Sequence, residues 1–131
     1  MTDDIKKDIL EDLKLARETW EEARLTAKEG KYRFSVSHIY YTCFYYLRAI
    51  LLTKGTAYQT HKGTLIGFRR LFVREGLAST ELSDFLEKLA RDRIEGDYKY
   101  AKFTSADVVL LTTQAEKFVA FAEDYLAPFL K

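Results

Sequence analysis

Hydrophobic residues recur at helical spacing along most of the chain. Between residues 4 and 29 they follow one another at intervals of four and three, and charged residues occupy most positions between them. This heptad-like spacing is typical of an amphipathic helix that packs along one face. The apolar positions are Ile5, Ile9, Leu13, Ala16, Trp20, Ala23 and Ala27. Residues 32–53 are apolar on nearly every side, which predicts a helix at the centre of a bundle.

The same reasoning predicts three further helices. One covers residues 61–75 after an N-cap at Thr60, and the next covers residues 80–102. The last begins at a capping box in residues 104–107 and repeats the apolar seam. Glycines in the left-handed conformation are expected to end helical stretches at Gly30, Gly55 and Gly76. No segment shows sustained strand alternation, so we predict an all-α bundle of about five helices that forms one domain over residues 1–131.

The charges are unevenly distributed, although the formal net charge is only +1. Residues 31–74 contain no Asp or Glu, whereas the segments before and after them are each net negative. The basic residues of this block are Lys31, Arg33, Arg48, Lys54, Lys62, Arg69, Arg70 and Arg74. Such a block indicates a phosphate-bearing or acidic partner. Much of the segment is also expected to be core, where acidic residues are rare, so both interpretations stay open.

Several classes of protein are disfavoured by what the sequence lacks. Cys43 is the only cysteine, so no intramolecular disulfide can form and nothing indicates an oxidising compartment. The longest uncharged run, residues 34–47, is shorter than the roughly 20 residues of a membrane span, and the N-terminus is too charged for a signal peptide. We therefore expect a cytoplasmic protein without a membrane association. There is no metal-ligand spacing, phosphate loop or serine-hydrolase motif, so no metal or cofactor is expected.

The segment RDRIEGDYKY, residues 91–100, carries six charged side chains in ten positions. Helical spacing places Arg93 and Tyr100 on the apolar stripe of their helix and Asp97 at its edge, while Tyr98 turns away. An arginine on a packing face is costly unless it is paired or faces a cleft. Three interpretations follow: an Arg93–Asp97 ion pair, an interface between two copies of the chain, or a phosphate-binding site.

Other polar residues give weaker indications. His61 lies at a helix start beside Lys62, which suits an anion site and a helix-cap role equally well. His38 lies in the crowded central helix and is expected to be a hydrogen-bonded structural histidine. The tyrosines near it are expected to serve the core and an interface rather than base stacking; they are Tyr40, Tyr41, Tyr45 and Tyr46. The basic side chains of the following helix gather on one side: Lys62, Arg69, Arg70 and Arg74.

Several short motifs follow one another in a characteristic order. A long amphipathic helix ends in EGKY, and S-x-x-YY-x-x-FY begins at Ser37. THKG begins at Thr60, a basic helix follows, and R-x-x-x-DY begins at Arg93. Over nearly the whole chain this pattern resembles the HEPN superfamily (higher eukaryotes and prokaryotes nucleotide-binding), in its small stand-alone prokaryotic branch. The resemblance implies an up-and-down helical bundle, commonly a homodimer, often encoded beside a minimal nucleotidyltransferase as a toxin–antitoxin or defence module.

The resemblance also implies roles for individual residues. Many HEPN proteins are metal-independent ribonucleases whose R-x(4–6)-H motif faces a cleft at the dimer interface. Arg93 matches the motif arginine, Tyr98 occupies the histidine position, and Tyr100 matches a tyrosine that some partner transferases adenylylate. With a pKa near 10, a tyrosine exchanges protons poorly near neutral pH, where a histidine does so readily. Asp97 and His61 are the alternatives for the missing base.

Three functions are therefore compatible with the sequence. The first, which we expect, is a nucleotide- or RNA-binding module with a degenerate motif that engages phosphate through Arg93 and the basic helix, beside a nucleotidyltransferase partner. The second is a ribonuclease toxin that uses Arg93 with Asp97 or His61. The third is a structural homodimer without a ligand, in which Arg93 and Asp97 pair across the two copies.

Overall fold

The computed structural model describes the backbone of residues 1–98 and 102–131, with the side chains at all of these positions except 95–98. Within these residues every regular element is a helix, and none is a strand. The α-helices are α1 (Asp3–Lys28), α2 (Tyr32–Leu52), α3 (His61–Phe68), α4 (Thr80–Tyr98) and α5 (Ser105–Leu126). A π-helical turn, η1 (Arg69–Val73), continues α3, and a short 3₁₀ turn, η2 (Ala127–Leu130), follows α5. The all-α prediction is confirmed.

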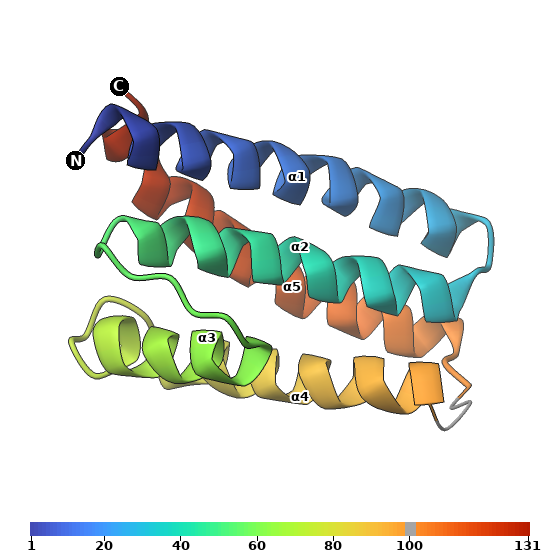
Figure 1. Ribbon diagram of the computed structural model, residues 1–131. Helices are drawn as coiled ribbons and strands as arrows, with labels where there is room; N and C mark the ends of the chain where they lie inside the picture. The colour runs from blue at the N-terminus through green and yellow to red at the C-terminus, as the bar shows by residue number, and fades with distance from the viewer. Residues whose placement is uncertain (99–101) are drawn as a thin grey trace.

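Helix α2 occupies the centre of the bundle, as its sequence predicts. It packs against α1, α3, α4 and α5, and in Figure 1 it runs between α1 on one side and the α3–α4 layer on the other, with α5 behind it. Eleven of its 21 residues are buried, among them Ile39, Tyr46 and Ile50. The uncharged run at residues 34–47 therefore serves the core. None of the helices in the described part of the chain combines the length and hydropathy needed to cross a membrane.

The predicted helix ends are confirmed by their local geometry. Gly30, Gly55 and Gly76 have φ angles of 75°, 72° and 77°, a region that side chains with a Cβ rarely adopt. The Thr60 hydroxyl accepts a hydrogen bond from the Gly63 amide and caps α3. Thr104 and Asp107 form the reciprocal capping box that starts α5.

Two predicted helices differ from the structure in detail. The expected helix at residues 61–75 is α-helical only as far as Phe68, because the backbone widens into a π-helical turn in which the Arg74 amide bonds to the Arg69 carbonyl. The expected helix at residues 80–102 does not include Lys102, because the chain is already outside the helix there and Thr104 takes the extended conformation that an N-cap needs.

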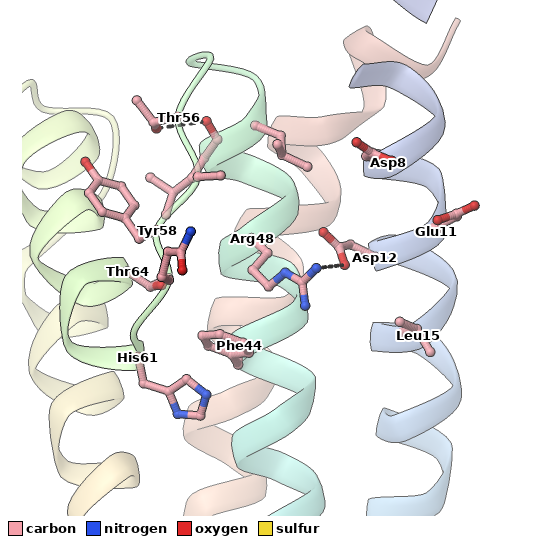
Figure 2. Close-up of a pocket in the computed structure, with 14 residues that line it drawn as sticks. Asp8, Glu11, Asp12, Leu15, Phe44, Arg48, Thr56, Tyr58, His61 and Thr64 are labelled. Atoms are coloured by element: carbon pink, nitrogen blue, oxygen red, sulfur yellow. Dashed lines mark hydrogen bonds and ion pairs between the residues drawn. The ribbon is translucent and has the colours of Figure 1, made fainter. Parts of the chain in front are cut away.

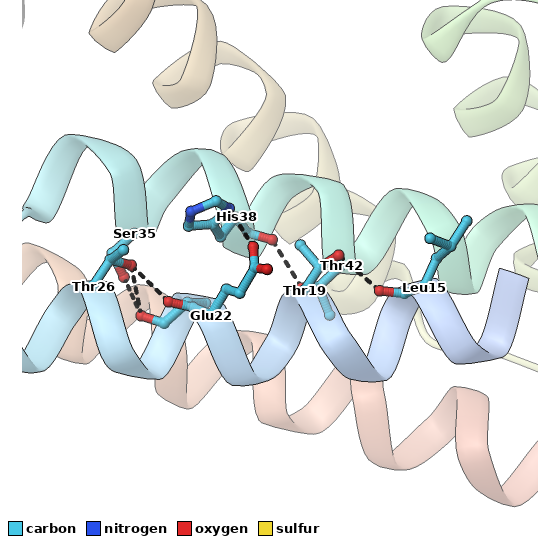
Figure 3. A network of polar contacts seen from close by, with 8 residues as sticks. Leu15, Thr19, Glu22, Thr26, Ser35, His38 and Thr42 are labelled. Carbon is cyan, nitrogen blue, oxygen red and sulfur yellow. Dashed lines mark hydrogen bonds and ion pairs between the residues drawn. The ribbon is translucent and has the colours of Figure 1, made fainter.

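Polar contacts fix α1 against α2 and α5. The buried Ser35 hydroxyl donates to the Ala23 carbonyl at 2.8 Å, so α1 and α2 approach closely near their connection (Figure 3). At the other face, Glu123 of α5 accepts hydrogen bonds from Arg17 of α1 and from the buried Tyr46 hydroxyl of α2. One carboxylate thus joins three helices. A carboxylate paired in this way gives the helices a defined register.

Candidate functional site

Arg93 of α4 points into the bundle toward α2. Its Nη2 atom donates a hydrogen bond to the Tyr41 hydroxyl at 2.9 Å. The guanidinium carbon also lies 5.3 Å from the centre of the Tyr40 ring and 5.2 Å from the centre of the Tyr41 ring. Cation–π contacts of this kind orient a guanidinium without neutralising its positive charge. The prediction that Arg93 lies on the packing face is confirmed.

His61 reaches the same aromatic cluster from the start of α3. Its ring centre lies 4.1 Å from that of Phe44, and its Nδ1 atom forms a hydrogen bond with the Tyr40 hydroxyl. Tyr40 therefore touches both Arg93 and His61, which lie 32 residues apart in the sequence. Sequence reasoning left open whether His61 could reach Arg93; the structure brings both to one tyrosine.

The protonation states follow from these surroundings. Burial of the imidazole, and then the positive charge of Arg93, lower the pKa of His61 below its usual 6.5, so His61 is neutral at pH 7. Burial raises the pKa of Tyr40 to about 12, against the opposing effect of Arg93, so its hydroxyl stays protonated. The cluster therefore combines one permanent cation with a neutral imidazole that can exchange a proton.

This cluster borders a pocket of about 380 Å³ between α2, α3 and α4. Arg93, His61, Lys62 and Arg69 contribute polar groups to its lining, and most of the remaining lining is apolar, including Leu65. An apolar cavity with a few convergent polar groups is the usual form of a ligand site. Among the described residues, no group of three or more His, Cys, Asp or Glu side chains is placed to hold a metal ion.

The structure separates the basic residues predicted for binding. Lys62 and Arg69 line the pocket, although Arg69 also pairs with Glu87 of α4 at 2.8 Å. Arg70 donates instead to the Tyr58 hydroxyl at 2.9 Å. Among the residues that the structure describes, neither Arg70 nor Arg74 lines this pocket. Acidic residues from α1 and α4 thus partly neutralise the basic block, which the linear sequence does not show.

Three of the predicted site residues are not among those whose side chains the structure describes. The side chains of Asp97 and Tyr98, and Tyr100 entirely, lie outside the described residues. Their proposed roles as alternative base, occupant of the histidine position and adenylylation target stay predictions.

Sequence reasoning missed Tyr40 and Tyr41, which it assigned to the core and an interface. Tyr40 is indeed buried, yet both tyrosines also contact Arg93. A signal was available, because an arginine on a packing face needs polar or aromatic partners and the central helix carries adjacent tyrosines.

His38 lies apart from this cluster, with Nδ1 3.8 Å from a Glu22 carboxylate oxygen on the α1–α2 face (Figure 3).

Comparison with known proteins places the chain in a family. The model of the HEPN domain matches residues 10–125. The chain belongs to the HEPN family. It is 35% identical over 105 residues to a UPF0332 protein of Thermotoga maritima, covering 79% of this chain and 80% of that protein. It is 32% identical to a UPF0332 protein of Gloeobacter violaceus, covering 86% and 90%.

A third relative carries a functional name. "Putative toxin MJ0605" of Methanocaldococcus jannaschii is 29% identical over 116 residues, covering 88% of this chain and 87% of that protein. The HEPN resemblance in the sequence motifs is thereby confirmed. Because one fold hosts many functions, the activity of this HEPN protein must be argued from its own residues.

Proposed function

We propose that this HEPN protein binds the phosphate groups of RNA or a nucleotide in the pocket beside Arg93. The observation that carries the proposal is the placement of Arg93 over Tyr40 and Tyr41 at a pocket that also receives Lys62. A guanidinium offers a planar fork of donors that matches phosphate oxygens, and aromatic contact fixes its orientation in advance. Less ordering is then needed when the anion binds.

The aromatic rings around Arg93 favour a nucleic acid over a simple anion. Tyr40, Tyr41, Phe44 and His61 form a continuous set of ring contacts beside the guanidinium. Proteins recognise single-stranded RNA by stacking unpaired bases on accessible rings while basic groups contact the backbone; in this set His61 is exposed, Tyr41 and Phe44 are partly exposed, and Tyr40 is buried behind them. The combination therefore supports single-stranded RNA as the ligand class.

The wider context forms part of the same proposal. The name of the Methanocaldococcus relative supports a role in a toxin–antitoxin module, and the sequence motifs support a homodimer and a nucleotidyltransferase partner. Co-purification with the product of the neighbouring gene tests the partnership, and mass measurement in solution tests the dimer. A monomer that captures no nucleotidyltransferase would contradict this part of the proposal without touching RNA binding.

RNA binding is tested by fluorescence anisotropy with a short single-stranded RNA over a range of salt concentrations. Affinity is expected to fall steeply between about 50 and about 200 mM salt. Arg93→Ala should weaken binding and reduce the slope of log affinity against log salt by about one. Arg33→Ala is a matched control, because Arg33 is an exposed arginine of α2 that does not line this pocket. Equal binding by both variants would refute the proposal.

A second candidate function is RNA cleavage with His61 as the base. The observation that favours it is the His61–Tyr40–Arg93 chain of contacts, in which the imidazole is neutral at pH 7. This role requires Nδ1–H to donate to the Tyr40 oxygen, which leaves Nε2 unprotonated and able to accept the proton of a 2′-hydroxyl. Cleavage by the wild type that disappears in both His61→Asn and Arg93→Ala would establish this activity. Intact RNA after prolonged incubation with the wild type would exclude it.

A further inference from the structure

A second and larger pocket lies on the other side of the His61–Phe44 contact. Its volume is about 620 Å³, and it opens between α1, the C-terminal half of α2 and the segment that precedes α3 (Figure 2). His61 and Phe44 line both pockets, so they form a shared wall. The proposed phosphate site uses none of the polar groups on the far side of this wall.

Those polar groups combine opposite charges at close range. Arg48 of α2 extends toward α1, where its Nη2 atom lies 3.4 Å from an oxygen of Asp12 (Figure 2). Asp8 and Glu11 of α1 line the same pocket. Asp12 is only 4% exposed, whereas the Arg48 side chain is 49% exposed and so accessible to a ligand.

The walls and the remaining lining suit a flat heterocycle. The Phe44 ring lies 6.0 Å from the Arg48 guanidinium carbon, and Tyr58 lines the side formed by the segment before α3. Gln59 adds an amide that can donate and accept hydrogen bonds. A volume of this size is ample for one nucleoside.

Resting on the proposed RNA binding, we infer that this second pocket is a nucleobase site that selects guanine. Guanine presents two adjacent acceptors, O6 and N7, which match a guanidinium fork such as that of Arg48. Its neighbouring Watson–Crick edge presents two adjacent donors, N1–H and the 2-amino group, which match a carboxylate such as that of Asp8; Asp12 is buried and already paired with Arg48. Adenine and uracil lack both of these paired edges, and cytosine lacks the paired donors.

The two pockets lie along the same helix, because both are lined by residues of α2. Tyr41, which contacts Arg93, precedes Arg48 by seven residues on α2, so the two lie about 10 Å apart along the helix axis. This is the reach of a nucleotide from the edge of its base to its phosphate. A guanine beside Arg48 therefore lies about one nucleotide's length from the Arg93 site along α2, on the opposite side of the Phe44–His61 wall.

The inference is tested on the wild-type protein with chemically altered bases. Short RNAs with one variable base in an otherwise uridine sequence are compared by fluorescence anisotropy. We expect the guanosine RNA to bind about tenfold more tightly than the adenosine RNA, within the discrimination that a bidentate base contact gives. Replacement of guanosine by inosine, which lacks the 2-amino group, or by 7-deazaguanosine, which lacks N7, should each remove most of this preference. Equal binding of all these RNAs would overturn the inference.

Two variants separate this inference from the RNA-binding proposal. Arg48→Gln should abolish the guanine preference and leave binding of the uridine RNA unchanged, whereas Arg93→Ala should weaken binding of every RNA by a similar factor. Arg33→Ala again serves as the control. RNA binding that depends on Arg93 but shows no base preference would overturn the guanine site alone.

A free nucleotide completes the test. Guanosine monophosphate and adenosine monophosphate are compared by calorimetry, which distinguishes a site for a base within RNA from a site for a free nucleotide. If no RNA binds, the RNA-binding proposal fails. The calorimetric comparison of the two nucleotides then tests whether the second pocket selects guanine. Binding of guanosine monophosphate that is lost in Arg48→Gln then supports a guanine site, and no preference over adenosine monophosphate overturns it.

Discussion

Asp12 is a buried carboxylate in α1, and its replacement by asparagine tests how the protein tolerates this charge. Burial raises the pKa of Asp12 to about 6; Arg48 at 3.4 Å opposes this shift, and Asp8 and Glu11 add to it. The folded-state pKa is thus about 2 units above the unfolded value of about 4. The protonated form is favoured in the folded state, so stability falls as pH rises from about 4 to about 6.

The magnitude follows from the size of the shift. About 2 units correspond to about 3 kcal/mol of unfolding free energy that is lost by pH 7 and retained at pH 4. Asparagine does not titrate, so Asp12→Asn should be more stable than the wild type at pH 7.5 by up to about 3 kcal/mol. The difference between the two proteins should shrink toward zero at pH 4.

Urea unfolding at several pH values measures this difference directly. Asp84→Asn is the matched control, because Asp84 is an exposed aspartate of α4 and its replacement should change stability little at any pH. A lower stability of Asp12→Asn at pH 7.5, with a deficit that grows with pH, would refute the reasoning. It would mean that the attraction of Arg48 outweighs the cost of burial.

Three further predictions concern the fold. Glu123→Ala removes the acceptor of the buried Tyr46 hydroxyl and should lower the unfolding free energy by about 1–3 kcal/mol; an unchanged urea midpoint would contradict this. Gly67→Ala places a methyl group against the Tyr58 ring and should cost about 1–3 kcal/mol in thermal unfolding, whereas a neutral effect would show that Tyr58 moves aside freely. Thr104→Ala removes the capping box of α5 and should cost about 1 kcal/mol, and full stability would show the cap to be dispensable.

The fold could be predicted from the sequence because local and global signals agree. The apolar seam of α1, the all-round hydrophobicity of α2 and the caps at Thr60 and Thr104 each specify a helix boundary or a buried face. The π-helical turn after Phe68 was not predicted, because residues 69–73 keep an ordinary helical pattern in sequence. The widening is a property of the backbone, and periodicity does not reveal it.

The candidate site could be predicted only in part. The position of Arg93 followed from periodicity, since it continues the stripe of Leu89 on α4. Its contact with Tyr41 and the approach of His61 depend on how α2, α3 and α4 pack together, and no local pattern encodes that arrangement. Likewise, Arg48 meets Asp12 only after α1 folds against α2. Contacts between helices, rather than within them, therefore define both pockets.

The proposed contact between Arg93 and RNA phosphate is tested most directly by one measurement. The affinity of the wild type and of Arg93→Ala for the same single-stranded RNA is measured against salt concentration. We expect a linear fall of log affinity with log salt for the wild type, a lower affinity for Arg93→Ala, and a slope that is smaller by about one. Parallel, superimposed lines for the two proteins would contradict it.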